Sequence, residues 1–133
     1  MNKILIMSRD PQTGELGQEA AAIAVDGCEY LYSIREEDGD IVLTLTCPGD
    51  IADWECEAIY DAYDEGAVFA GLKEREGLPN PAWTAVLPFN GDAGLLEGEV
   101  NRILKAHKAE LESVMEAIVG LAADYEKRQN GDA

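Results

Sequence analysis

Carboxylates are the side chains of this sequence whose number and spacing most clearly suggest a function. Along residues 50–65, Asp53, Glu57 and Asp61 follow one another at steps of four. On a helix, such carboxylates rise about 6 Å per step along one face, a separation of the same order as the phosphates of a nucleic-acid strand. The acidic stripe, as we call this candidate binding surface, consists of Asp50, Asp53, Trp54, Glu57, Asp61, Asp64 and Glu65.

The acidic stripe contains no base that could pair with its carboxylates. Like charges four residues apart destabilise a helix by a few tenths of a kcal/mol per pair, and a lysine in the run would remove that cost. The absence of a base therefore favours a surface that binds a basic partner, and in its sharper form a surface that imitates nucleic acid. The alternative is a solvated helix face, which is what most runs of charge are.

A thiol nucleophile is a second candidate chemistry. Cys47 precedes the predicted N-terminus of a helix, where the helix dipole lowers a thiol pKa, and His107 is the only imidazole available to activate it. Both residues also fall on predicted apolar faces. This placement favours a buried thiol and a hydrogen-bonded core histidine over a catalytic pair.

Metal and cofactor chemistry finds little support in the motifs. The acids of residues 36–40 do not have the spacing of a calcium-binding loop. Cys28, Cys47 and Cys56 include no CxxC pair, as expected of reduced thiols in a reducing compartment. We find no glycine-rich phosphate loop and no serine-hydrolase or zinc-protease motif. The sequence predicts no metal site and no cofactor.

The charge of the chain is concentrated rather than spread. The net charge is −17 over 133 residues, and residues 26–65 contribute −12 of it, with thirteen acids and the single base Arg35. A field on one side of the molecule repels nucleic acid and anionic membranes and attracts basic proteins. Adaptation to high salt is a further explanation, but it predicts an even distribution.

Length and hydropathy indicate one domain, expected over residues 1–128, with a loose tail at 129–133. No stretch approaches the roughly 20 apolar residues of a membrane helix. The apolar run of residues 4–7 is too short for a signal peptide. We therefore expect a cytoplasmic protein with no membrane partner.

Two Asp-Gly pairs organise the first half of the chain into a predicted antiparallel meander. Residues 26–27 and 38–39 suit two-residue hairpin turns. These turns would pair Ile23 with Tyr30, and Tyr30 in turn with Cys47. The second turn would also pair Tyr32 with Leu45 and Ile34 with Leu43. The shared apolar face would then comprise Ile23, Val25, Cys28, Tyr30, Tyr32, Ile34, Leu43, Leu45 and Cys47. Residues 3–8 form a further predicted strand.

Helices dominate the predicted second half. A short acidic helix should begin at Asp50 and end near Glu65, before Gly66. Residues 67–72 are a candidate strand, and residues 83–89 alternate as a strand that Pro88 should end or place at an edge.

A long amphipathic helix is predicted over residues 95–128, with Asp92 near its start. At 1.5 Å per residue it would extend about 50 Å, more than the ~30–35 Å width of a globule of this size. It should therefore kink, at Gly98 or Gly120, or project to a partner, which favours a homodimer. Its apolar seam comprises Leu96, Val100, Ile103, His107, Leu111, Val114, Ile118, Leu121 and Tyr125.

Taken together, these patterns predict an α+β fold: a four- to five-stranded antiparallel sheet, one short acidic helix and one long C-terminal helix. In size, charge and terminal helix the chain is similar to small acidic dimers that act as secretion chaperones. In charge density it is similar to phage-encoded inhibitors that imitate DNA. Both resemblances concern composition alone. The predicted function is non-catalytic binding of a basic protein partner, and the alternatives are a thiol- or metal-dependent enzyme and a chaperone-like dimer.

Overall fold

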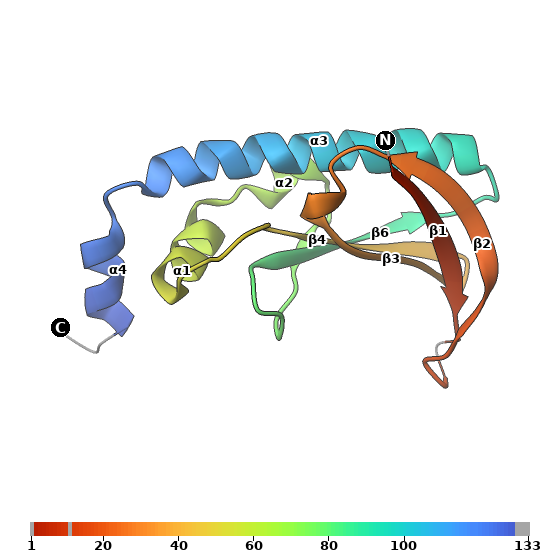
Figure 1. Ribbon diagram of the computed structural model, residues 1–133, viewed down its shortest axis with the longest axis horizontal. Helices are drawn as coiled ribbons and strands as arrows, with labels where there is room; N and C mark the ends of the chain where they lie inside the picture. The colour runs from red at the N-terminus through yellow and green to blue at the C-terminus, as the bar shows by residue number, and fades with distance from the viewer. Residues whose placement is uncertain (1, 11, 130–133) are drawn as a thin grey trace.

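Strands and helices alternate in blocks along the chain, and the fold class is α+β as predicted. The computed structural model describes residues 2–10 and 12–129 (Figure 1). The strands are β1 (Asn2–Arg9), β2 (Leu16–Val25), β3 (Leu31–Glu37), β4 (Asp40–Thr46), β5 (Lys73–Glu74) and β6 (Ala82–Pro88). The helices are η1 (Cys28–Tyr30, a 3-10 turn), α1 (Asp53–Ala62), α2 (Glu65–Val68), α3 (Ala93–Ile118) and α4 (Ala122–Gln129).

The strands form one mixed sheet in the order β2-β1-β3-β4-β6-β5. This corrects the expectation of a four- to five-stranded antiparallel sheet. All neighbouring strands are antiparallel except β1 and β3, which pair in parallel through Met7 with Arg35 and Ser8 with Glu36. Strand β1 is therefore an inner strand, as its apolar residues on both faces suggest.

The hairpin at residues 38–39 is confirmed. Asp38 and Gly39 both have positive φ, 56° and 84°, as a two-residue hairpin turn requires. Ile34 pairs with Leu43 as predicted. Further from the turn a register shift between Leu31 and Ser33 places Leu31, not Tyr32, opposite Leu45, and Tyr30 belongs to η1 rather than to a strand opposite Cys47.

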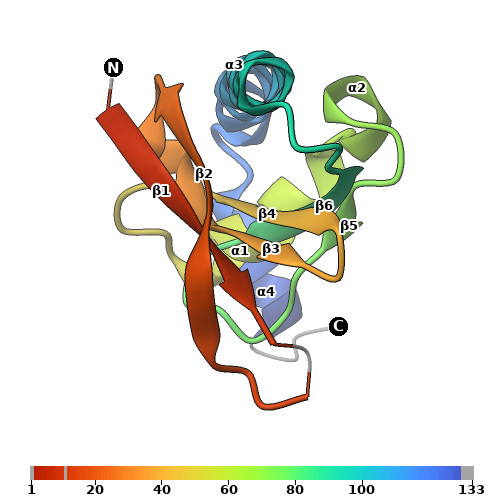
Figure 2. The ribbon, with the colours of Figure 1, turned by 90° about the vertical axis from the view of Figure 1, so that its right-hand side faces the viewer.

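The hairpin predicted at residues 26–27 is wrong. Gly27 has φ 85°, but Asp26 does not have positive φ, and η1 follows the turn. The backbone N–H of Asp26 donates to the side chain of Asn101 on α3 (2.9 Å) instead of to a hairpin partner. Strand β2 pairs with β1, where Ile23 lies opposite Ile4, and the chain crosses behind β1 to reach β3 (Figure 2).

The predicted acidic helix over residues 50–65 is shorter and interrupted. Helix α1 begins after Ala52, whose N–H donates to the Glu55 carboxylate (3.0 Å), so Asp50 is not the cap. Helix α1 ends at Ala62, because Tyr63 takes an extended conformation and turns into the core. The strand expected at residues 67–72 is also wrong, since this segment holds the end of α2 and a loop.

Strand β6 confirms the strand predicted at residues 83–89, and Pro88 is its last residue. It is not an edge strand, because it pairs with β4 along its whole length and with the two-residue β5 on its other side.

The long C-terminal helix kinks at one of the two expected glycines. Helix α3 is capped by Asp92, whose carboxylate accepts from the Leu95 N–H (3.1 Å). It passes straight through Gly98 and ends at Ile118, and Gly120 (φ 87°) turns the chain into α4. Helix α4 includes residue 129, and the rest of the predicted tail, residues 130–133, lies outside the described residues.

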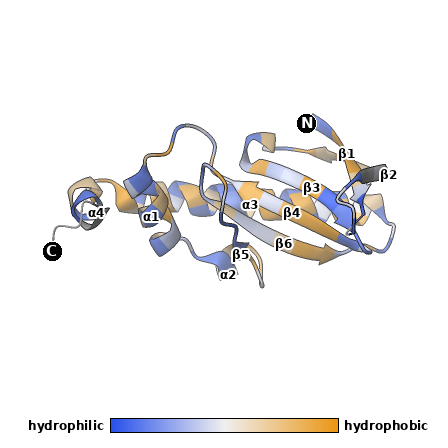
Figure 3. Ribbon diagram, turned by 90° about the horizontal axis from the view of Figure 1, so that it is seen from below, coloured by the Kyte–Doolittle hydropathy of each residue, from blue (hydrophilic) through white to orange (hydrophobic). Residues whose placement is uncertain are grey.

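Helix α3 runs the length of the molecule over one face of the sheet (Figure 1). Its apolar side packs on inward-facing residues of β1, β2, β4 and β6 to form the core. Among the described residues, no helix covers the opposite face of β3, β4 and β6 (Figure 3). Leu5 and Val86, each about half exposed, lie on that open face.

Candidate functional site

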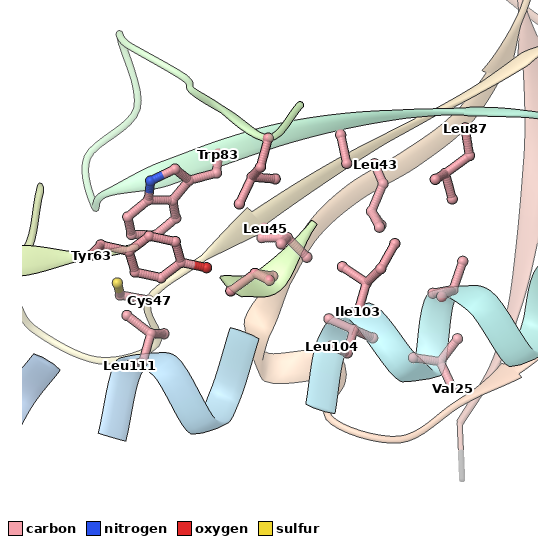
Figure 4. Close-up of a cluster of buried hydrophobic side chains, with 14 of the residues drawn as sticks. Val25, Leu43, Leu45, Cys47, Tyr63, Trp83, Leu87, Ile103, Leu104 and Leu111 are labelled. Carbon is pink, nitrogen blue, oxygen red and sulfur yellow. The ribbon is translucent and has the colours of Figure 1, made fainter. Parts of the chain in front are cut away.

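The core contains a cluster of aromatic rings around the single histidine. The rings of Trp83 and Tyr63 stack, with centroids 4.0 Å apart and planes inclined by 19°. Figure 4 shows the two rings between β6 and α3, next to Cys47 and Leu111. His107 meets the Trp83 ring edge-on at 5.4 Å, and Tyr30 meets His107 edge-on at 5.9 Å. This packing fixes the position of Tyr30 and of the middle of α3.

His107 is a satisfied core histidine. It is fully buried, and its Nε2 lies 2.8 Å from the carbonyl oxygen of Thr46. A carbonyl can only accept, so Nε2 carries the proton, and Nδ1 accepts from the Tyr63 hydroxyl (2.7 Å). Burial lowers the pKa of His107 to about 4, so the ring is neutral at pH 7.

Cys47 does not have the environment of a nucleophile. The thiol is buried, and burial raises its pKa to about 12. His107 bonds the carbonyl of the preceding Thr46 rather than this sulfur, and its Nδ1 is occupied by Tyr63. The predicted effect of a helix N-terminus is missing because α1 begins only at Asp53, six residues further on.

The apolar seam of the long helix packs within its own chain. Its first seven residues are buried: Leu96, Val100, Ile103, His107, Leu111, Val114 and Ile118. Leu121 and Tyr125, beyond the kink, are partly buried against the core. The seam residues up to Ile118 are thus covered by the molecule's own sheet and helices, and the homodimer stays a prediction.

The acidic stripe is divided by the fold. Asp50 and Asp53 lie in the loop before α1 and in its first turn, and Asp64 lies beyond its end; all three are exposed. Helix α4 packs against α1, where the Tyr125 hydroxyl donates to Asp61 (2.9 Å) and its ring approaches Trp54 (6.5 Å). Glu57 and Glu65 are partly buried. The stripe is therefore shorter and less open than the continuous track that the sequence suggests.

A groove lies beside the second half of α3. It has a volume of about 780 Å³. One wall is η1 and the segment after β4, and the other is the stretch of α3 from Ala109 to the kink. Apolar side chains dominate the lining: Tyr30, Cys47, Pro48, Ile51, Ala109, Leu111, Met115 and Val119.

The wall opposite α3 is held in place by hydrogen bonds. The Asn80 side chain donates to the carbonyls of Cys47 (2.7 Å) and Gly49 (2.9 Å). The Thr46 hydroxyl and the Cys47 N–H both donate to the Pro81 carbonyl, at 3.1 and 3.3 Å. The groove is therefore preformed, which lowers the entropic cost of binding a ligand there.

Unpartnered carboxylates border the groove. Glu112 and Glu116 lie one turn apart on α3 and are exposed, and neither has a hydrogen-bond or ion-pair partner among the described residues. On the opposite wall, the exposed Glu29 and Asp50 adjoin Tyr30 and Ile51 in sequence. Within the described residues, no lysine or arginine lines the groove.

A second hollow, of about 630 Å³, lies between α2, the end of β6 and the start of α3. Its two carboxylates already have structural roles. Asp92 caps α3, and Glu99 accepts from the guanidinium of Arg102. That pairing lowers the pKa of Glu99. We therefore regard the groove beside the second half of α3 as the candidate site.

Sequence patterns contain one signal for this groove. Leu111, a residue of the seam, is followed at steps of four by Met115 and Val119, which form an apolar row that diverges from the seam. Val119 is 78% exposed, the highest value that the structure gives for a described large apolar side chain. The opposite wall had no comparable signal, because Tyr30 and Ile51 reach it from two separate loops.

Two further candidate classes can be compared with the structure. In the described ranges, no group of three or more histidine, cysteine or acidic side chains is arranged to hold a metal ion. None of the described helices is both long and apolar enough to cross a membrane.

Comparison with known proteins identifies a family for the chain but no relative of known function or structure. No curated protein and no solved structure has significant similarity to it. One family model matches, and it covers residues 1–126, which include both walls of the groove. The chain belongs to the family of unknown function DUF6762.

Proposed function

We propose that the protein is a non-catalytic binding protein that engages a basic protein partner. The observation that carries the proposal is the surface placement of its concentrated charge. All thirteen acids of residues 26–65 are exposed or partly exposed, and none belongs to the buried core. A surface of one sign accelerates encounter with a partner of the opposite sign and excludes partners of the same sign.

Local hydrogen bonds keep part of this charge ionised. Glu36 accepts from the Ser8 hydroxyl (2.6 Å) and from the Gly39 N–H (2.7 Å), and these bonds lower its pKa. Arg35, the single base of the segment, pairs with Glu37 (3.0 Å). The pair is partly exposed and neutralises one acid of the thirteen, so the segment remains strongly negative.

Imitation of nucleic acid is the finer form of this proposal. It depends on the acidic stripe presenting carboxylates at regular spacing, as phosphates are presented along a strand. The short α1 and the contact between Tyr125 and Asp61 reduce the length of that track. The coarser form, attraction of a basic surface, does not depend on the track.

The two alternative classes predict different outcomes in simple assays. A thiol enzyme would need a reactive Cys47, whose burial and raised pKa oppose that role. A chaperone-like dimer would need a surface for a second copy, since the seam up to Ile118 is already buried. Light scattering would detect such a dimer directly.

The test begins with capture of partners from native lysate, followed by purification of the captured protein. Binding should be measured at about 0.05 M and about 0.5 M ionic strength, because screening weakens attraction between exposed charges. We expect a basic partner whose affinity falls at least about tenfold between the two conditions. A partner that is acidic, or whose affinity is unchanged by salt, would refute the proposal.

A charge variant identifies the surface involved. Asp50→Asn, Asp53→Asn and Asp64→Asn together remove three exposed charges around α1. The matched control, Asp10→Asn with Glu15→Gln and Glu19→Gln, removes three exposed charges around the β1–β2 turn, away from α1. Weaker binding by the first variant alone would support a role for the acidic stripe, and equal loss by both would indicate diffuse attraction.

A further inference from the structure

The sheet ends before α3 does, and this difference in length creates the groove. Strand β2 stops at Val25, and β4 stops at Thr46. Helix α3 continues to Ile118 with its apolar face still directed toward the interior. Beyond the sheet, that face is covered on one side by α1, which lies beside the second half of α3 (Figure 1). On the other side, η1 and the segment after β4 leave a groove along α3.

The chain itself turns away from this groove. Gly120 has φ 87°, a conformation that side chains other than glycine rarely adopt. The turn directs α4 against α1, where Tyr125 packs beside Trp54. Val119, the residue just before the turn, is left lining the groove with 78% of its surface exposed. The described chain therefore supplies no segment to cover Val119, and it covers Met115 only in part.

The charges around the groove favour a positively charged ligand. Glu112 and Glu116 project from one wall and have no hydrogen-bond or ion-pair partner in the part of the chain that the structure describes, and Glu29 and Asp50 adjoin the other wall. Glu112 and Glu116 are also four residues apart, a spacing at which like charges destabilise a helix. A ligand with positive charges beside an apolar surface would relieve that repulsion. A second copy of this chain is disfavoured, because each copy carries a net charge of −17.

We infer that the groove between Tyr30, Ile51 and residues 109–119, at the end of α3, binds a basic amphipathic helix of a partner protein. The inference rests on the function proposed above and assigns it a site. Apolar side chains of the partner would lie on Tyr30, Met115 and Val119, and its lysines or arginines would face Glu112 and Glu116. Ten residues of α3 extend about 15 Å, which matches three turns of a bound helix.

The lining suits such a ligand in two respects. Met115 has a flexible, polarisable side chain that adapts to varied apolar surfaces. Tyr30 is held rigid by its edge-on contact with His107, so it offers a fixed apolar platform. A rigid platform beside an adaptable side chain binds helices of related but not identical sequence.

The test uses a fluorescent synthetic peptide of about 15 residues with leucines on one helical face and lysines on the other. Two matched peptides separate the contributions: one replaces the lysines by glutamine, and one replaces the leucines by serine. Fluorescence anisotropy gives the dissociation constants. We expect the leucine–lysine peptide to bind about tenfold or more tightly than either control, because each loses one half of the complementarity.

Variants of the protein then locate the binding site. Val119→Ser and Val86→Ser make the same change at two exposed valines, one in the groove and one on the open sheet face. Glu112→Gln with Glu116→Gln is matched by Glu15→Gln with Glu19→Gln. We expect each groove variant to weaken binding about five- to tenfold and each control to change it less than twofold, with every variant still unfolding cooperatively close to the wild-type temperature.

The results distinguish failure of the groove as the binding site from failure of the proposed binding of basic proteins. Equal affinities of groove and control variants would overturn the groove while leaving the attraction to basic partners intact. Equal affinities of the leucine–lysine peptide and its glutamine counterpart would contradict the proposed function as well. Absence of binding, or a dimer by light scattering that Val119→Ser dissociates, would also refute the assignment of the groove to a basic helix.

Discussion

The two halves of α3 have the same apolar pattern but different surroundings. In the first half, Glu97 and Asn101 form hydrogen bonds with the edge strand β2: Glu97 accepts from the Ala24 N–H (2.6 Å), and Asn101 donates to the Ala24 carbonyl (2.9 Å). In the second half, Glu112 and Glu116 border a groove and have no described partner. Polar residues beside the buried face thus complete the fold in one half and remain available for binding in the other.

His107 lies where the two halves meet. Before His107 in the chain, the side chains of α3 pack on the sheet and form hydrogen bonds with it. After His107, the helix extends beyond the end of the sheet. The His107 ring connects β4, through the Thr46 carbonyl, with Tyr63 and the Trp83 ring. We therefore expect the residues around His107 and those in the first half of α3 to contribute most of the free energy of unfolding. The groove residues should contribute little to it or reduce it.

Removal of Trp83 should have the largest effect. Trp83→Ala deletes a fully buried indole that stacks on Tyr63, and large-to-small changes of this kind cost about 3–5 kcal/mol. Trp54→Ala is the matched control, because Trp54 is only partly buried. Urea denaturation should show a much smaller loss for Trp54→Ala. Similar losses would argue against the junction as the centre of stability.

The pH dependence of stability should carry the signature of His107. Its pKa is lowered to about 4 in the folded state against 6.5 unfolded, so the unfolded chain binds the proton first as the pH falls. Stability is full above about pH 6.5 and declines toward pH 4, by about 3 kcal/mol at most.

His107→Gln isolates this contribution, because other groups also titrate in acid. The bonds that lower the pKa of Glu36 and Glu99 make their contributions fall away mainly below pH 4.5. The difference in unfolding free energy between the wild type and His107→Gln should therefore shrink between pH 6.5 and pH 4.5. A difference independent of pH would contradict a buried neutral histidine.

Opposite signs are expected for polar residues in the two halves of α3. Asn101→Ala removes the partners of Ala24 and Asp26 in a partly buried place and should cost about 1–2 kcal/mol. Glu112→Gln with Glu116→Gln removes a like-charge pair and should stabilise by a few tenths of a kcal/mol. Chemical denaturation at low salt measures both. Destabilisation by the glutamine variant would mean that the groove carboxylates have structural partners.

The smallest expected changes in stability come from alanine substitutions at two glycines, which are also the most closely matched pair. Gly98 and Gly120 both have open space around the position of a β-carbon, but only Gly120 has positive φ. Gly98→Ala should stabilise α3 by up to about 1 kcal/mol through helix propensity, whereas Gly120→Ala should destabilise by about 1 kcal/mol through backbone strain. Equal effects on the melting temperature would mean that the kink does not depend on this conformation.

Sequence patterns correctly predicted the elements whose conformation is determined by residues close together in the chain. The hairpin at residues 38–39 formed because Asp38 adopts the positive φ that the turn requires, and α3 followed its apolar periodicity. The hairpin at residues 26–27 failed because a turn sequence does not specify which strand pairs with which. Asn101, 75 residues away, occupies the Asp26 N–H, and β2 pairs with β1 instead.

The candidate site was less accessible to sequence analysis for the same reason. The acidic stripe was visible as a run, but the contact of Tyr125 with Asp61 depends on where Gly120 directs α4. The groove is made by three segments far apart in the chain, and one of its walls depends on hydrogen bonds from Asn80. Only the row Leu111, Met115 and Val119 was readable in advance.

The most direct test of this account is a map of backbone and methyl NMR shifts during titration with the leucine–lysine peptide. The account predicts the largest changes at Tyr30, Ile51, Met115 and Val119, with little change at Leu5 and Val86 on the open sheet face. Changes concentrated on that sheet face, or spread evenly over the acidic residues of the 38–40 turn and α1, would contradict the assignment of the groove.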